Sequence, residues 1–162
     1  MSTSRLVRLI ARTGRIAEPG PVSPGTIYEG AQVLRGSVHV RYLDVGGGTD
    51  CAMEISAAFG PVYDLERYGV RLVASPRHAD VLVITGVVTR NMVEPLRRTV
   101  EATPKPRFIV TVGDAAITGG PFLGGYGVAG VVSDFVDVDL EVPGSPPDPA
   151  EIVAALRRIS GR

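Results

Sequence analysis

The stretches Val81-Leu-Val-Ile-Thr85 and Phe108-Ile-Val-Thr-Val112 decide the fold of this chain. Both are short, apolar and rich in β-branched residues, which is typical of strands that are buried on both faces of a sheet. A helix is expected between them, capped by Asn91 and carrying an apolar stripe of Met92, Leu96 and Val100. A strand, a helix and a second strand in this order predict parallel pairing of the two strands through a crossover helix.

The same alternation continues outward in both directions. The last helix has the clearest start signal, with Asp148 as its cap and Pro149 at its first position, and Gly161 is suited to end it. The other expected elements are a strand over 37–45, a helix capped by Asp50 and running to Phe59, a helical turn over 63–68, a buried strand over 70–74, and an edge or half-exposed strand over 136–142. This order predicts an α/β fold, a flavodoxin-like open and mainly parallel sheet with helices on both faces.

Composition and charge bound the class of protein. The chain has 162 residues, of which 44% are hydrophobic and 21% charged, and its 17 basic residues balance 17 acidic ones. This is the composition of a globular domain, and it gives no overall field that would favour nucleic acid as a partner. One cysteine excludes an intramolecular disulfide and fits a reducing cytoplasm.

The first 35 residues differ from the remainder. They form a basic N-terminal segment followed by a Pro/Gly-rich linker, and a single α/β domain is expected over 36–162. No apolar run in them suits a secretory leader or a membrane span. One interpretation is a basic helical face that lies on a membrane or a partner, and the other is a solvated terminus. The residues of that face are Arg5, Arg8, Arg12 and Arg15.

Three loops are expected to meet at one edge of the sheet. They follow the strands that end near Val45, Val112 and Val142, and sites in open α/β sheets gather beyond the carboxyl ends of the strands. The turns in these loops are rich in glycine and proline, as in Gly113-Asp114 and Pro143-Gly144.

From about Gly36 to Ile159 the chain resembles the small, cluster-bearing subunit of membrane-bound [NiFe] hydrogenases of the formate hydrogenlyase type. It also resembles the related B subunit of NADH:quinone oxidoreductase. The stretches that carry the resemblance are Ala74-Ser-Pro-Arg-His-Ala-Asp80, Val112-Gly-Asp-Ala-Ala116, Gly119-Gly120 and Val142-Pro-Gly-Ser-Pro-Pro147. The resemblance implies a [4Fe–4S] cluster held by four cysteines, a hydrogenase-like large subunit and membrane subunits as partners, and a place on the inner face of the cell membrane.

The cysteines of that family fall on other residue types here. Laid on the hydrogenase pattern, the four positions are Gly48, Cys51, Ala115 and Ser145, and the quinone-reducing branch would use Asp50 in place of Gly48. Only Cys51 supplies the thiolate that such a cluster prefers. Asp50 and Asp114 adjoin positions without a thiol and offer oxygen atoms, which suit harder ions. We therefore expect the cluster to be lost, with no cofactor and no metal in this subunit.

Four further side chains carry open interpretations. Cys51 is either a small residue packed near a helix start or a reactive thiol, and the neighbouring acids oppose the second. The resemblance makes Glu54, Arg77 and His78 candidate partner contacts or proton-handling groups, whereas for His78 an ordinary loop histidine is the preferred interpretation. The scattered histidines and cysteine form no zinc motif.

The stretch Gly125-Tyr-Gly-Val-Ala-Gly130 matches a dinucleotide-binding fingerprint, but its context is wrong. That motif needs a strand before it and a helix after it, and neither is expected here. A glycine-rich loop at a partner surface, with Phe122 and Tyr126 as apolar anchors, is the better interpretation.

Three functions are consistent with these observations. The first is a structural or docking subunit of a hydrogenase-like or NADH:quinone-oxidoreductase-like complex, without its own catalytic centre. The second is an electron-transfer subunit that retains an atypically ligated iron–sulfur cluster. The third is a stand-alone small-molecule binder that uses the pocket at the strand ends.

Overall fold

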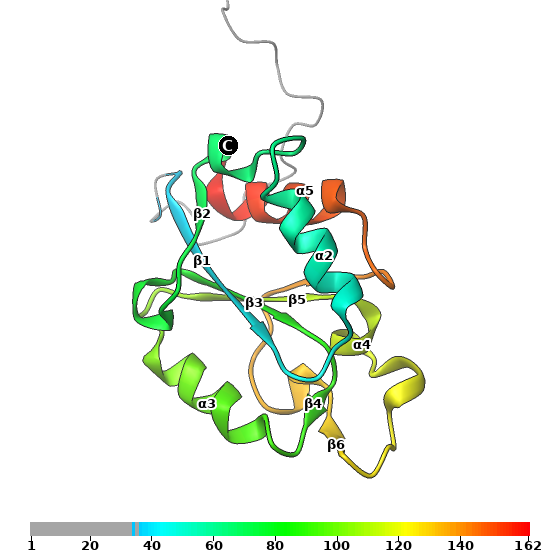
Figure 1. Ribbon diagram of the computed structural model, residues 1–162. Coiled ribbons are helices and arrows are strands. Elements are labelled where there is room, and N and C mark those ends of the chain that lie inside the picture. Colours follow the sequence, from blue (N-terminus) through cyan, green and yellow to red (C-terminus); the bar gives the residue numbers. More distant parts are fainter. Residues whose placement is uncertain (1–33, 35) are drawn as a thin grey trace, which may run out of the picture.

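A five-stranded parallel sheet organises the molecule. The computed structural model describes residues 34 and 36–162 (Figure 1). The strands lie in the order β2-β1-β3-β5-β7, which is the flavodoxin order 2-1-3-4-5 when they are counted along the chain. Their bounds are β1 Val38–Asp44, β2 Val70–Leu72, β3 Val81–Thr85, β5 Phe108–Val112 and β7 Leu140–Val142. The predicted fold class is therefore confirmed.

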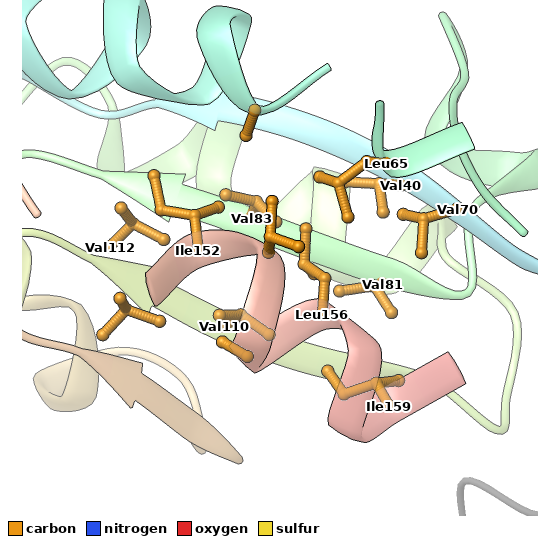
Figure 2. Packing of buried hydrophobic residues seen from close by; sticks show 14 of the residues in the cluster. Val40, Leu65, Val70, Val81, Val83, Val110, Val112, Ile152, Leu156 and Ile159 are labelled. Atoms are coloured by element: carbon orange, nitrogen blue, oxygen red, sulfur yellow. The ribbon is translucent and has the colours of Figure 1, made fainter. Parts of the chain in front are cut away.

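Helices cover both faces of the sheet (Figure 1). Helices α2 (Thr49–Ala58) and α5 (Pro149–Ser160) pack on one face, and α3 (Val93–Ala102) and the short α4 (Asp114–Ile117) pack on the other. Figure 2 shows Ile152, Leu156 and Ile159 of α5 pointing into the first of these two cores, against strand residues such as Val83 and Val110. Burying a side chain of this size contributes about 1.5–3 kcal/mol.

Smaller elements complete the chain. Strand β4 (Val88–Thr89) pairs antiparallel with β6 (Val128–Gly130) in a separate two-stranded sheet. Single 3-10 turns are η2 Leu65–Tyr68, η3 Pro76–His78, η4 Gly120–Phe122 and η5 Val132–Asp134. Within the described residues, no helix is long and apolar enough to cross a membrane.

The strand predictions succeed in the middle of the sheet and fail in part at its edges. Every residue of β3 and β5 is buried, as predicted. The expected buried strand over 70–74 is shorter, and Arg71 and Leu72 are exposed because β2 lies at the sheet edge. The strand predicted over 136–142 is an edge strand, but only Leu140–Val142 pairs with β5. The Asp139 carboxylate accepts the N–H of Ile109 (2.7 Å), so a side chain replaces the first backbone acceptor of that ladder.

Two predicted helix caps are wrong. Gly48 in extended conformation precedes α2, and Asp50 lies inside its first turn, where a carboxylate still favours the positive end of the helix. Helix α3 follows Met92, whose N–H is bonded to Thr89 O in a preceding turn, so Asn91 does not cap it. The last helix is as predicted. Asp148 accepts the N–H of Ala150 (2.7 Å), and Gly161 ends the helix with φ 73°.

Candidate functional site

A cleft of about 300 Å³ opens at the carboxyl edge of the sheet. It is bounded by the β1–α2 loop, the end of β3, the start of α4 and the β7–α5 loop, with one side chain from the glycine-rich loop over 119–130. The residues that line it are Gly47, Gly48, Thr49, Asp50, Cys51, Thr85, Gly86, Asp114, Ala115, Phe122, Gly144 and Ser145. The three loops that the sequence predicted to meet therefore do so.

The β1–α2 loop is fixed by a close backbone approach. Gly86 follows β3 with φ 81°, and a β-carbon on it would lie 2.0 Å from the nitrogen of Gly47. Only glycine permits this contact and this backbone angle together. The Asp44 carboxylate also holds this loop, since its Oδ1 accepts the N–H groups of Gly46 (3.0 Å) and Gly47 (2.7 Å).

The single thiol is packed into the wall of the cleft. Cys51 is the third residue of α2 and is 7% exposed. Its sulfur lies against Gly113, where an added β-carbon would be 2.6 Å from Sγ. Gly113 has φ 95°, and it connects β5 to α4. Helix α2, which follows the β1–α2 loop, thus contacts the β5–α4 connection through this sulfur–glycine pair.

The second and third loops are joined by hydrogen bonds around Asp114. Its backbone N–H donates to Gly144 O (2.8 Å), and its Oδ1 accepts the N–H of Gly144 (2.8 Å). The N–H of Gly113 also donates to Val142 O (2.9 Å). One oxygen of the Asp114 carboxylate is therefore already used to hold the loop that carries Ser145.

The electrostatics of the cleft disfavour a thiolate. The pKa of Cys51 is raised to about 11, chiefly by burial and then by the carboxylates of Asp50, Asp114, Asp44 and Glu54 in that order. Among the residues that the structure describes, no lysine, arginine or histidine lines the cleft. The free protein therefore holds Cys51 as a neutral thiol at pH 7, which is the opposite of an activated nucleophile.

The structure brings most of the predicted site residues together. Gly48, Asp50, Cys51, Asp114, Ala115 and Ser145 all line the cleft. Glu54 is half-buried one helical turn after Cys51 and does not line it. Arg77 and His78 lie in η3, directly before β3, and so at the opposite edge of the sheet from the cleft.

The sequence interpretation missed Thr85 and Gly86. Thr85 is fully buried, and its hydroxyl lies 3.0 Å from the Tyr42 hydroxyl beside the cleft. Burial is the main cause that raises the pKa of Tyr42. Thr85 ends a strand already predicted to be central and Gly86 follows it, so the rule that sites lie beyond the carboxyl ends of strands points to both.

The donors at the four family positions do not fit a cluster held by four thiolates. Cys51 offers sulfur, Ser145 an exposed hydroxyl, Ala115 a methyl group and Gly48 no side chain. Asp50 and Asp114 add oxygen, of which one atom is already bonded to Gly144. Across residues 34 and 36–162, no three His, Cys, Asp or Glu side chains are grouped so as to share a metal ion.

Comparison with known proteins identifies the family. The model of the family described as NADH ubiquinone oxidoreductase, 20 Kd subunit, matches residues 49–159, which contain all of α2, β3 and β5 and all but the last residue of α5. The chain belongs to this family. Among the four positions discussed above, the matched region includes Cys51, Ala115 and Ser145 and begins one residue after Gly48.

Individual relatives and solved structures show what the chain is similar to. Formate hydrogenlyase subunit 7 of Escherichia coli is 41% identical over 117 residues, which cover 72% of this chain but only 46% of that protein. Uncharacterized protein MJ0516 of Methanocaldococcus jannaschii is 41% identical over 124 residues, covering 76% of this chain and 83% of that protein. The same fold occurs in the membrane-bound sulfane sulfur reductase, an archaeal respiratory membrane complex (TM-score 0.69, 24% identity, 81% of this chain and 72% of that one).

Proposed function

We propose that this protein is a docking subunit of a membrane-associated oxidoreductase complex of the hydrogenase or NADH:quinone oxidoreductase type, and that it carries no [4Fe–4S] cluster of its own. The observation that carries the proposal is the cleft itself. Gly48, Cys51, Ala115 and Ser145 meet there, and only one of them is a thiol. Family membership supports the complex, and the donor chemistry supports the loss of the cluster.

Contacts within the chain itself join the loops around the cleft. The loops are joined by the paired Asp114–Gly144 hydrogen bonds and by the contact of Gly86 with Gly47. Losing three thiols therefore removes electron transfer while it leaves the loops and their outer surface in place. This separation of shape from chemistry is what a docking subunit requires.

The surface next to the cleft has the composition of a protein interface. The glycine-rich loop over 119–130 exposes Phe122, Leu123 and Tyr126, the last with 92% of its area accessible. Met53 is exposed on α2, two residues after Cys51. Phe122 lines the cleft, and the exposed apolar groups on its loop indicate a surface that a partner covers. We assign this surface to a hydrogenase-like large subunit.

The predicted membrane contact lies outside the described residues. The four residues concerned belong to the first 33 of the chain: Arg5, Arg8, Arg12 and Arg15. We propose that they contact the anionic membrane surface or the membrane subunits. The complex is then cytoplasmic and peripheral on the inner face of the cell membrane. Arg77 and His78, exposed at the opposite edge of the sheet, remain candidate contacts to another subunit, and Glu54 one to the large subunit.

The docking role is tested by purification of the native complex through a tag on this chain. Replacing Phe122 and Tyr126 with serine should reduce recovery of the large subunit by about tenfold or more, since apolar anchors dominate interface energies. Leu72→Ser, an exposed apolar residue on the edge strand β2, is the matched control and should leave recovery unchanged. Equal recovery with both variants, or a natural chain that purifies without any partner, would contradict the proposal.

An electron-transfer subunit with an atypical cluster is the second candidate. The observation in its favour is that Cys51 and the free oxygens of Asp50 and Asp114 line the same cleft. It predicts iron and acid-labile sulfide in this subunit, both lost in Cys51→Ala. Iron content therefore decides between the two candidates.

A further inference from the structure

The connection from β2 to β3 leaves part of the sheet without a helix. In parallel sheets, the crossover between two strands usually carries a helix that covers one face of the sheet. Here the crossover is residues 73–80, which contain the 3-10 turn η3 in place of a helix (Figure 1). Ala79 of this connection belongs to the core on the face of α3, which also holds Leu82 and Ile109 of β3 and β5. The crossover therefore passes over that face.

Burial along β1 shows where the sheet stays open. Strand β1 is paired on both sides, and its buried residues Val38 and Val40 belong to the core on the α2/α5 face. The alternate residues point to the face of α3, since Arg41 pairs in register with Leu82 of the core there. They are only half-buried, and they are His39, Arg41 and Leu43. An inner strand that is half-open on one face indicates a surface for another element.

Arginine side chains give this surface a positive charge. Arg71 of β2 is exposed and pairs in register with His39, so it projects from the same face as Arg41. We call His39, Arg41, Leu43 and Arg71 the β1/β2 face. The acid of the adjoining connection is already engaged, because Asp80 Oδ2 accepts the N–H of His39 (2.9 Å) and lies 3.3 Å from its Nδ1. Within the described part of the chain, neither Arg41 nor Arg71 forms an ion pair.

The Arg41 guanidinium points most directly to a missing partner. Its Nε is buried and has no hydrogen-bond partner among residues 34 and 36–162, although the residue as a whole is half-buried rather than enclosed. A buried donor on a charged group costs free energy when it is left unpaired, and a carboxylate is the acceptor that a guanidinium binds most strongly. Leu43 and Val73, both half-buried, add apolar area on the same face.

We propose that an acidic segment of another subunit covers the β1/β2 face, in the place of the absent crossover helix, with a carboxylate on Arg41 and Arg71 and apolar side chains against Leu43 and Val73. The inference rests on the proposed function, because it needs a complex, and it names a partner contact separate from the glycine-rich loop. The first 33 residues of the chain carry four arginines and two glutamates, so like charge disfavours them as the occupant.

The test is a photo-cross-link in the assembled complex. The full chain carries p-benzoylphenylalanine at position 74, an exposed position next to Val73, and the products are mapped by mass spectrometry after irradiation. We expect a product with an Asp- or Glu-containing segment of another subunit. Arg71→Glu should lower its yield roughly tenfold, as expected for reversing one charge of an interfacial pair. Arg67→Glu, the same change at an exposed arginine of η2, should not lower it, because η2 packs through Leu65 on the opposite face.

Arg41→Met separates docking from a role in the fold. Methionine keeps an apolar stem and removes the unpaired charge, so the isolated chain should unfold at the same urea concentration or a higher one. In the complex, the same variant should lower the yield of the cross-link roughly tenfold. Reversing the cross-linked acid to lysine in the Arg71→Glu background should restore the product.

Four outcomes would overturn the inference. They are a product with residues 1–33 of the same chain, a product with lipid, no product, and a yield that neither Arg71→Glu nor Arg41→Met changes. In each of these cases, recovery of the large subunit with the tagged chain and the iron content still report separately on the proposed function.

Discussion

The sulfur of Cys51 rests against the α-carbon of Gly113, so that a single added methyl group at position 113 would stand 2.6 Å from Sγ. The contact joins helix α2, which contains Cys51, to Gly113, which directly follows strand β5. It also places the thiol in the wall of the cleft, packed against backbone. The contact therefore gives a direct handle on whether the cleft is a rigid part of the fold.

Gly113→Ala is expected to destabilise the protein more than Gly124→Ala, a replacement of a glycine with a similar φ. Positive φ costs about 1–2 kcal/mol for alanine, and overpacking against the sulfur adds about 1–3 kcal/mol. Gly124→Ala is the control, because Gly124 has φ 87° and open space at its β-carbon. Urea unfolding measures both. Adding Cys51→Ala should recover the overpacking part of the Gly113→Ala loss, and strictly additive losses would refute the contact.

The pKa of Cys51 predicts how the thiol reacts. With a pKa of about 11 instead of the ordinary 9.0, the folded protein holds about 100-fold less thiolate at pH 8 than a free cysteine. Alkylation by iodoacetamide should therefore be slow at pH 8 and accelerate as pH rises towards 11. Rates in the urea-unfolded chain are the reference. Rapid alkylation of the folded protein at pH 7 would show that the acids around Cys51 do not act as described.

The same shift makes stability depend on pH. Because the pKa is raised on folding, the folded state keeps its proton while the unfolded state loses it between about pH 9 and 11. The free energy of unfolding should fall across that window. Below the window it should not depend on pH through Cys51. Cys51→Ala should reduce this fall. Tyr42, whose pKa is also raised, supplies a further decline at high pH that Tyr42→Phe should remove.

Asp114 is expected to act as a structural tie between two loops. Asp114→Ala leaves the N–H of Gly144 without its side-chain acceptor and should cost about 1–3 kcal/mol, with faster hydrogen exchange at Gly144. Asp114→Asn keeps an oxygen at the same place and should cost less. Asp137→Ala, at an exposed aspartate, is the control and should change stability by no more than about 0.5 kcal/mol. Equal hydrogen exchange at Gly144 in all three variants would show that the tie is not formed in solution.

The part of the fold that sequence predicts is the part that burial dictates. β3 and β5 are covered on both faces, so their residues had to be continuously apolar, and Asp148-Pro149 mark a helix start by their own chemistry. The caps predicted at Asp50 and Asn91 were wrong because the neighbouring backbone turns determine where the helices begin, after Gly48 and after Met92. Those turns depend on tertiary contacts that no local pattern records.

Site residues could be predicted where the family resemblance supplied their positions. They could not be predicted where only the packing of the folded chain brings them to the site. Gly48, Cys51, Ala115 and Ser145 were assigned from motif order, and the structure gathers them in one cleft. Thr85 escaped because a buried threonine in an apolar strand has no local signature. The β1/β2 face escaped as well, since it depends on the register between two strands that are far apart in the sequence.

Restoring the missing thiols is expected to restore a cluster. The combined variant Gly48→Cys, Ala115→Cys and Ser145→Cys places four sulfurs around the cleft, and the β-carbon added at position 48 meets only the end of the flexible Asp50 side chain, at 2.9 Å. Anaerobic reconstitution should give about four irons and four sulfides per chain. The same variant with Cys51→Ala is the control and should bind less. Failure to bind iron in the four-cysteine chain would mean that the cleft has not kept the family's geometry.

The most direct measurement is the iron and acid-labile sulfide content of the natural chain, purified anaerobically by itself and within its native complex. We expect near-zero iron in the isolated chain, and no cluster signal in the complex that changes with Cys51→Ala. About four irons and four sulfides bound by this subunit, and lost in Cys51→Ala, would contradict this expectation and assign electron transfer to the subunit.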